Sequence, residues 1–342
     1  MIDPERIQPY PDLKPLDLLT AFASGTSPAA VLILDNNFDI ALNLLQPRTI
    51  DELRENGIPV LESQRVLLKV WSVIKQLDDD KYQFAWPIMV GEKLNAVRTK
   101  AKEIARTILQ ENQSNIQFFL KVAQEESFSA HQFPLLASLV LDGMVWDQLQ
   151  ELGVVDNIDF GSMETGSSFW KGLAWITYPE KSFRLGTNGF VRGEYGFSQS
   201  WTPQSLPLQK PIMKSAVLQQ KLVDFVDNPK SYIRDKDHDQ LAKMGFFEED
   251  QLTIPYLHHE HTLWQAGKKL AAQVTSVLKD EIAKIDLELM IGMEFKGALI
   301  IFYHEIYPAM LEHLIGMGIE LPGVMQGDVN APIANSFFIT KY

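Results

Sequence analysis

The alternation of apolar and polar residues between positions 40 and 90 predicts two helices followed by a half-buried strand. Thr49 is followed three residues later by Glu52, the spacing of a capping box, and Gly57 is typical of the left-handed residue that ends a helix. Apolar residues then recur at the spacing of a second helix, so the polar residues between them are expected to face solvent. These apolar positions are Val66, Leu67, Val70, Trp71, Ile74 and Leu77.

A strand is predicted after the second helix. Three aspartates at 78–80 indicate a tight turn, and Tyr82, Phe84 and Trp86 then alternate with polar or small residues, as in a strand with one buried face. The predicted order over residues 40 to 90 is helix, helix, turn, helix and hairpin. This order resembles the winged-helix form of helix-turn-helix domains.

The resemblance implies double-stranded DNA as a partner, because the second helix of the motif enters the major groove in DNA-reading members. The acidic turn at 78–80 departs from a DNA-touching wing, which usually offers Arg or Lys, so a winged helix used for dimerisation or packing stays as the alternative. By the resemblance, the side chains facing DNA would be Ser63, Gln64, Arg65, Lys69 and Ser72.

Beyond residue 90 the chain is mostly helical, and we expect an α+β fold with long connecting helices. Residues 92–125 carry a helical pattern that could pack on its own chain or pair two copies in a homodimer. We expect one domain over 1–125, the winged helix with its long following helix, and an α+β domain over 126–342. Near 215–258, a helix, an acidic turn and a strand are compatible with a second winged-helix-like unit.

Aromatic residues crowd the stretch from 160 to 203, which predicts a small antiparallel β element with a hairpin at about 169–201. Asn188 and Gly189 are the residues expected at its turn. Such an element could close the core of the second domain. Alternatively, it could line a pocket for a flat or anionic small-molecule ligand, with Trp175, Arg184, Arg192, Tyr195 and Trp201 as the lining residues.

Composition and charge remove several classes of function. The 342 residues contain no cysteine, which excludes disulfides, iron–sulfur clusters and thiol nucleophiles. The net charge of −13 argues against nonspecific coating of nucleic acid. No leader-like or membrane-spanning apolar stretch stands out, so we expect a cytoplasmic protein that does not enter a membrane.

A cluster of histidines is the main candidate for chemistry. His258 and His261 share a face if their segment is helical, and His304 could complete a metal site from the last helix, beside Glu305. The spacing of metalloprotease histidines is missing, and so are a phosphate-binding glycine loop and a nucleophile elbow. Capping or packing histidines are the alternative, and no cofactor is expected unless a metal binds.

Asp142, inside an apolar helix, is a candidate for a buried acid. We therefore expect a winged-helix, DNA-binding regulator with a ligand-sensing second domain. The alternatives are a protein-interaction module without DNA binding and an enzyme of unrecognised type that uses the C-terminal histidines.

Overall fold

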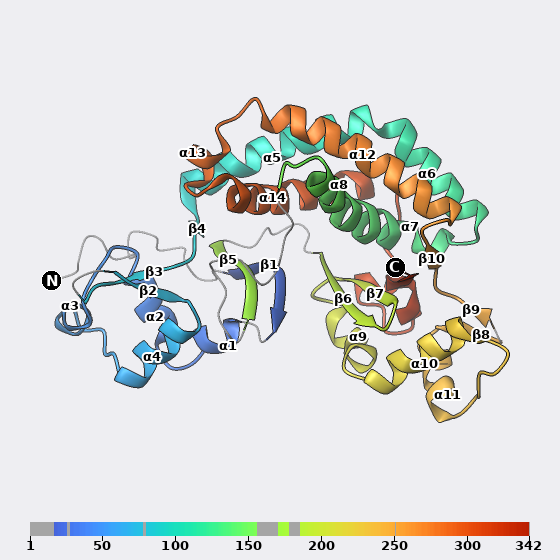
Figure 1. The fold of residues 1–342 in the computed structure, drawn as a ribbon, viewed down its shortest axis with the longest axis horizontal. Helices are drawn as coiled ribbons and strands as arrows, with labels where there is room; N and C mark the ends of the chain where they lie inside the picture. The colour runs from blue at the N-terminus through green and yellow to red at the C-terminus, as the bar shows by residue number, and fades with distance from the viewer. Residues whose placement is uncertain are drawn as a thin grey trace. The chain divides into compact units, whose positions relative to one another are not determined.

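The computed structural model describes residues 17–25, 28–77, 80–155, 170–177, 185–249 and 251–341. Helices alternate with several small sheets along the chain, which confirms the α+β class (Figure 1). None of the helices in these ranges combines the length and the apolar character needed to cross a membrane.

Two compact units divide the chain, and the chain passes between them several times. The first unit comprises Met1–Thr99, Val155–Glu180 and Asp286–Tyr303, and the second comprises Lys100–Val154, Lys181–Ile285 and His304–Tyr342. No single cut in the sequence separates them.

Four short helices and a hairpin follow one another near the start of the first unit. The hairpin consists of β2 (Ile74–Gln76) and β3 (Tyr82–Phe84), and an isolated bridge pairs Arg48 with Tyr82. The helices are α1 (Ala29–Leu32), α2 (Asn37–Leu42), α3 (Ile50–Glu55) and α4 (Glu62–Val70).

The capping box expected at Thr49 is confirmed. The Thr49 side-chain oxygen accepts from the Glu52 amide at 3.1 Å, and the Glu52 carboxylate accepts from the Thr49 amide at 2.7 Å. These two bonds satisfy amides that the first turn of α3 leaves without intrahelical partners. Gly57 has φ +80°, which confirms the left-handed residue expected after this helix.

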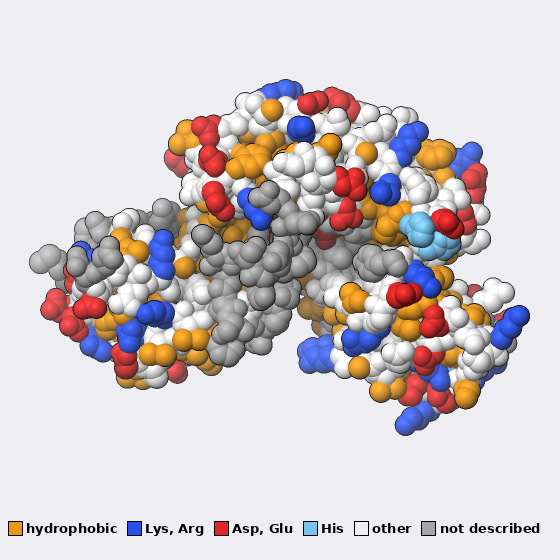
Figure 2. All heavy atoms as spheres, viewed as in Figure 1, with side chains coloured by type: hydrophobic (Ala, Val, Ile, Leu, Met, Phe, Trp, Pro, Cys, Tyr) orange, Lys and Arg blue, Asp and Glu red, His pale blue; other side chains and the backbone are white. Residues whose placement is uncertain are grey.

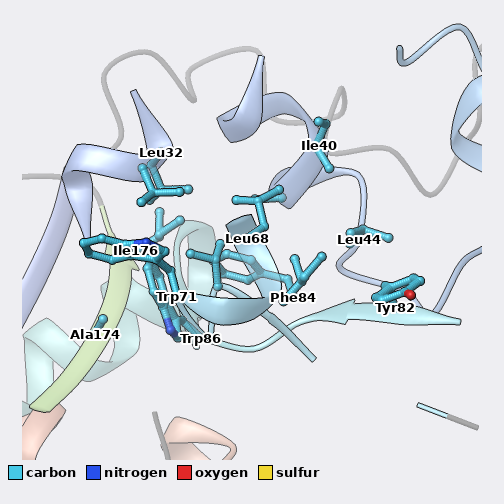
Figure 3. Close-up of a cluster of buried hydrophobic side chains, with 14 of the residues drawn as sticks. Leu32, Ile40, Leu44, Leu68, Trp71, Tyr82, Phe84, Trp86, Ala174 and Ile176 are labelled. Atoms are coloured by element: carbon cyan, nitrogen blue, oxygen red, sulfur yellow. The ribbon is translucent and has the colours of Figure 1, made fainter. Parts of the chain in front are cut away.

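A three-stranded sheet in the first unit joins segments far apart in the sequence. Its order is β1 (Asp17–Gly25), β5 (Trp170–Thr177) and β4 (Ile88–Met89). Side chains of β5 pack into the same core as the short helices (Figure 3), where Leu68, Trp71 and Ile176 are almost fully buried. The Trp170 indole donates to the Trp71 carbonyl at 3.0 Å and ties the sheet to the end of α4.

Helices dominate the second unit and the segments that enter it. The stretch expected as one helix at 92–125 is two helices, because Asn112 breaks the pattern between them and its side chain bonds back to the Ile108 carbonyl. The elements are α5 (Gly91–Glu111), α6 (Gln113–Glu125), η1 (Ser129–His131), α7 (Gln132–Pro134), the π-helix η2 (Leu135–Met144), α8 (Val145–Glu151), α12 (Thr262–Ile282), α13 (Leu287–Ile291) and α14 (Phe295–Gly316). Of these, α13 and the first parts of α5 and α14 belong to the first unit.

The strand pairing shows that the hairpin expected at about 169–201 is wrong. β5 pairs with β1 and β4, whereas β6 (Gly186–Arg192) and β7 (Tyr195–Trp201) form a hairpin in another sheet. Asn188 and Gly189 lie inside β6, and the turn falls at 193–194. The long-range pairing of β7 with β11 (Phe337–Lys341) fixes this register, and β10 (Tyr256–His258) lies beyond β11 in the same sheet.

One face of this sheet packs on a group of short helices and a small hairpin. Ile212, Leu222, Phe246 and Phe337 are in its core. The elements are α9 (Leu206–Met213), α10 (Ala216–Asp227), α11 (Lys236–Lys243), β8 (Phe247–Glu248) and β9 (Gln251–Leu252), followed later by η3 (Gly323–Gln326) and η4 (Ile333–Ser336). The region near 215–258 thus contains two helices, a turn and short strands.

Candidate interaction surface on helix α4

Helix α4 turns a different face to solvent from the one its sequence predicts. Gln64, expected outside, is buried with 6% exposure, while Val66 and Val70, expected inside, are each 44% exposed. Leu61, at the N-cap of α4, is 62% exposed. The outer side of the helix is therefore centred on aliphatic residues.

Hydrogen bonds to Gln64 explain the rotation of this face. Its side-chain amide donates to Asn36 at 2.8 Å and to Asn37 at 3.1 Å, and its oxygen accepts from the Leu61 amide at 3.0 Å. A buried amide is stable only when it has such partners. Two of the three come from a turn almost thirty residues earlier, so helical periodicity cannot reveal them.

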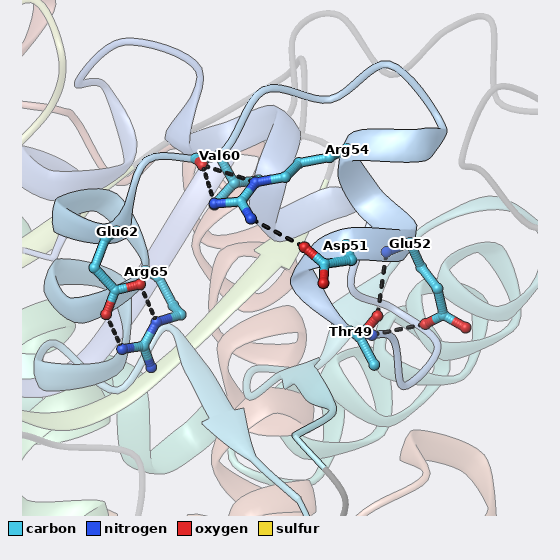
Figure 4. Close-up of polar contacts among 7 residues, drawn as sticks. All are labelled: Thr49, Asp51, Glu52, Arg54, Val60, Glu62 and Arg65. Carbon is cyan, nitrogen blue, oxygen red and sulfur yellow. Dashed lines mark hydrogen bonds and ion pairs between the residues drawn. The ribbon is translucent and has the colours of Figure 1, made fainter.

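The Arg65 side chain bonds to neighbouring residues of its own domain. Its guanidinium makes a two-pronged ion pair with Glu62 (Figure 4) and donates to the Tyr82 hydroxyl at 2.6 Å. The hydrogen bonds with Glu62 raise the pKa of Arg65 and lower the pKa of Glu62. Arg54 is committed in a similar way, to Asp51 and to the carbonyl of Val60.

The other residues expected to face DNA do not share one environment. Ser63 and Lys69 are exposed, and the Lys69 ammonium donates to Gln76 at 2.7 Å. Ser72 lies beyond the end of α4 at φ +55°. Residues 28–90 hold nine acidic and six basic side chains, so this region lacks the positive excess that phosphate binding needs.

A turn that bonds to the segment before α4 also carries exposed apolar side chains. Ile33 is 79% exposed and Leu34 is 47% exposed, and the next residues of this turn bond to the segment before α4 through Asn36, which donates to the Pro59 carbonyl at 2.8 Å. In Figure 2, hydrophobic side chains gather over α4 along the lower edge of the lobe at the left. We call Leu61, Val66 and Val70 the α4 stripe.

The residues expected to line a ligand pocket do not share one sheet. Trp175 is fully buried in β5 of the first unit, and Arg184 lies outside the described residues. In the second unit, Arg192 donates to Gln219 at 2.7 Å.

Two other members of the expected pocket also have partners within the second unit. The Tyr195 hydroxyl donates to Asp227, and burial together with this hydrogen bond raises the pKa of Tyr195. The Trp201 ring packs over Gly186, across the β6–β7 hairpin. Since Gln219 and Asp227 both belong to α10, Arg192 and Tyr195 fasten that helix to the hairpin.

The histidines expected to bind a metal lie at separate positions. His261 caps α12, where its Nδ1 accepts from the Leu263 amide at 3.2 Å, and its ring lies 5.8 Å from that of His258. Burial lowers the pKa of His261. His304 instead lies against Trp146, with ring centroids 6.5 Å apart. Within the described ranges, no three His, Asp or Glu side chains come together as a metal site would require.

A polar cluster surrounds Asp142 on the π-helix η2. Burial raises the pKa of Asp142, and hydrogen bonding from Thr187 and the charge of His304 oppose that rise. Thr187 also bonds to Ser138 at 2.9 Å, and Ser138 bonds to Ser200. Asp142, expected from the sequence as a buried acid, is half-buried, and it lies in a network of hydroxyl groups next to a histidine from α14. Glu305, the other acid considered there, is 8% exposed.

The α4 stripe is an exposed apolar feature that helical periodicity does not predict, because helical spacing assigns Val66 and Val70 to the core. Comparison with known proteins adds no relative from which a role could be transferred. No family model, no curated protein and no solved structure matches the chain.

Proposed function

We propose that the chain is an interaction protein whose first unit contains a winged-helix domain that binds a protein partner through α4. The order α2, α3, α4 and the β2–β3 hairpin supports the winged-helix assignment, together with the bridge from Arg48 to Tyr82. The order α10, α11 and β8–β9 supports a second winged-helix-like unit.

The α4 stripe carries this proposal. A helix that reads DNA offers side chains that donate to bases and phosphates, whereas here Val66 and Val70 occupy the outer face and Arg65 is held by Glu62 and Tyr82. Exposed aliphatic groups that lie together are typical of protein-binding surfaces.

DNA binding is the second candidate. Exposed Ser63 and Lys69 favour it, since both can donate to phosphate oxygens. A small-molecule ligand is supported less, because Arg192 and Tyr195 already bond to α10. An enzyme that uses the C-terminal histidines is also supported less, because the described residues bring no three His, Asp or Glu side chains together.

A DNA titration separates the two main candidates. Fluorescence anisotropy would follow binding of labelled, sheared genomic duplexes to the full chain over a salt series, with Lys69→Ala as the variant. We expect no saturable binding at low salt. Saturable binding that weakens steeply with salt, and that Lys69→Ala reduces, would overturn the proposal and establish a DNA-binding surface on α4.

A further inference from the structure

We propose that the partner of α4 is a second copy of this chain, joined across a two-fold axis near Val66. This inference rests on the proposed function of the α4 stripe and names its occupant. It follows from how charge is distributed along the exposed face of the helix.

The exposed face of α4 has opposite charges at its two ends. Glu62, Val66 and Lys69 are spaced by four and three residues, so they lie along one side of the helix, and all three are exposed. An acidic residue therefore begins the face, an aliphatic residue occupies its middle and a basic residue ends it.

Two such faces are complementary when they pair antiparallel. A two-fold axis through Val66 brings the two valines together and sets Glu62 of each copy beside Lys69 of the other. Isologous interfaces need this self-complementarity, because the same surface serves both partners. Parallel pairing would instead place like charges together at both ends, which is unfavourable.

Both charged groups retain capacity for a new bond. Each Glu62 oxygen accepts one hydrogen bond from Arg65, and a carboxylate can accept about four. The Lys69 ammonium has three donors and uses one of them on Gln76. An intermolecular pair between Glu62 and Lys69 therefore requires neither residue to give up its present partner.

Aliphatic contacts would supply the rest of the interface. Val70 is one turn beyond Val66 on the same side, and Leu61 precedes the helix. Because α4 has only nine residues, the buried area is small compared with an obligate dimer. We expect a reversible dimer whose population rises with concentration.

Sedimentation equilibrium of the full chain, over a concentration series, tests this arrangement. The wild type should rise from 38.8 kDa toward twice that mass. Val66→Asp should stay monomeric, because it places two carboxylates at the axis. Val217→Asp is the matched control, since Val217 is 61% exposed on α10.

Charge exchange provides the sharper test. Glu62→Lys and Lys69→Glu should each weaken the dimer at least about fivefold, because each places like charges together across the axis. The double variant should dimerise more tightly than either single variant, because opposite charges again meet across the axis, while the loss of the ion pair between residue 62 and Arg65 keeps it weaker than the wild type.

Each outcome separates this inference from the proposed function. A wild type that stays monomeric, a dimer that survives Val66→Asp, or a double variant weaker than both single variants would overturn pairing through α4. None of these results is evidence for DNA binding, which the anisotropy titration tests separately. Loss in the single variants with recovery in the double variant would support the antiparallel pair.

Discussion

Lowering the pH from 8 to 5 should destabilise the second unit, and His131 should account for a defined part of the loss. His131 ends η1 and is 3% exposed. Its Nε2 lies 3.3 Å from the Ala334 carbonyl oxygen, which can only accept, so Nε2 carries the hydrogen of a neutral ring. Burial lowers the pKa of His131 to about 4.

The sign of the effect follows from comparing the two states. In the unfolded chain the ring takes a proton near its usual pKa of about 6.5, whereas the folded protein resists protonation until about pH 4. The stability contribution of neutral His131 is therefore fully present above about pH 6.5. It is lost progressively as the pH falls from there toward 4.

The magnitude comes from the same two pKa values. Their difference, at about 1.4 kcal/mol per pKa unit, sets an upper limit of about 3 kcal/mol. Between pH 8 and pH 5 the linkage relation gives a loss of about 2 kcal/mol. Carboxylates and the other histidines add their own pH dependence, so His131 has to be isolated by a variant.

His131→Gln provides that variant, because a glutamine amide can donate to the Ala334 carbonyl but does not titrate. Urea unfolding followed by far-UV circular dichroism would give the free energy of unfolding at pH 8 and pH 5 for both proteins. The wild type should lose about 2 kcal/mol more than His131→Gln. Equal losses, or a larger loss in the variant, would refute the assignment of a buried neutral ring.

Three further variants test other parts of the structure by urea unfolding. Thr49→Ala should cost the first unit about 1 kcal/mol, because it removes the N-cap acceptor of α3, and an unchanged midpoint would contradict that role. Asp142→Asn should be more stable than the wild type at pH 7, because its amide oxygen can still accept from Thr187 and no charge has to be desolvated. This advantage should shrink toward pH 4, and an advantage independent of pH would argue against the raised pKa. Gly186→Ala should destabilise the second unit by about 2 kcal/mol, because its Cβ would overlap the Trp201 ring. A loss below about 0.5 kcal/mol would mean that the ring moves aside at little cost.

Local signals in the sequence predicted local structure well. The capping box at Thr49 and the left-handed Gly57 both depend on residues within a few positions, and both are confirmed. In each case the interactions that decide the structure lie close together in the chain.

Interactions between residues far apart in the chain explain the features that the sequence did not predict. Gln64 is buried because Asn36 and Asn37 bond to it, and the resulting rotation of α4 exposes Val66. β5 pairs with β1, a strand about 150 residues earlier, instead of with the nearby β6. Such pairings depend on the folded chain as a whole, which periodicity and turn residues do not encode.

A protein-binding surface on α4 is the central proposal. Its most direct test is affinity capture by the tagged full chain from an extract of the source cells that also holds untagged chain, with the retained proteins quantified for wild type, Val66→Asp and Val217→Asp. We predict that wild type and Val217→Asp retain partner proteins, including untagged copies of this chain, and that Val66→Asp loses them. Retention of the same proteins by Val66→Asp and wild type would contradict the assignment of the α4 stripe.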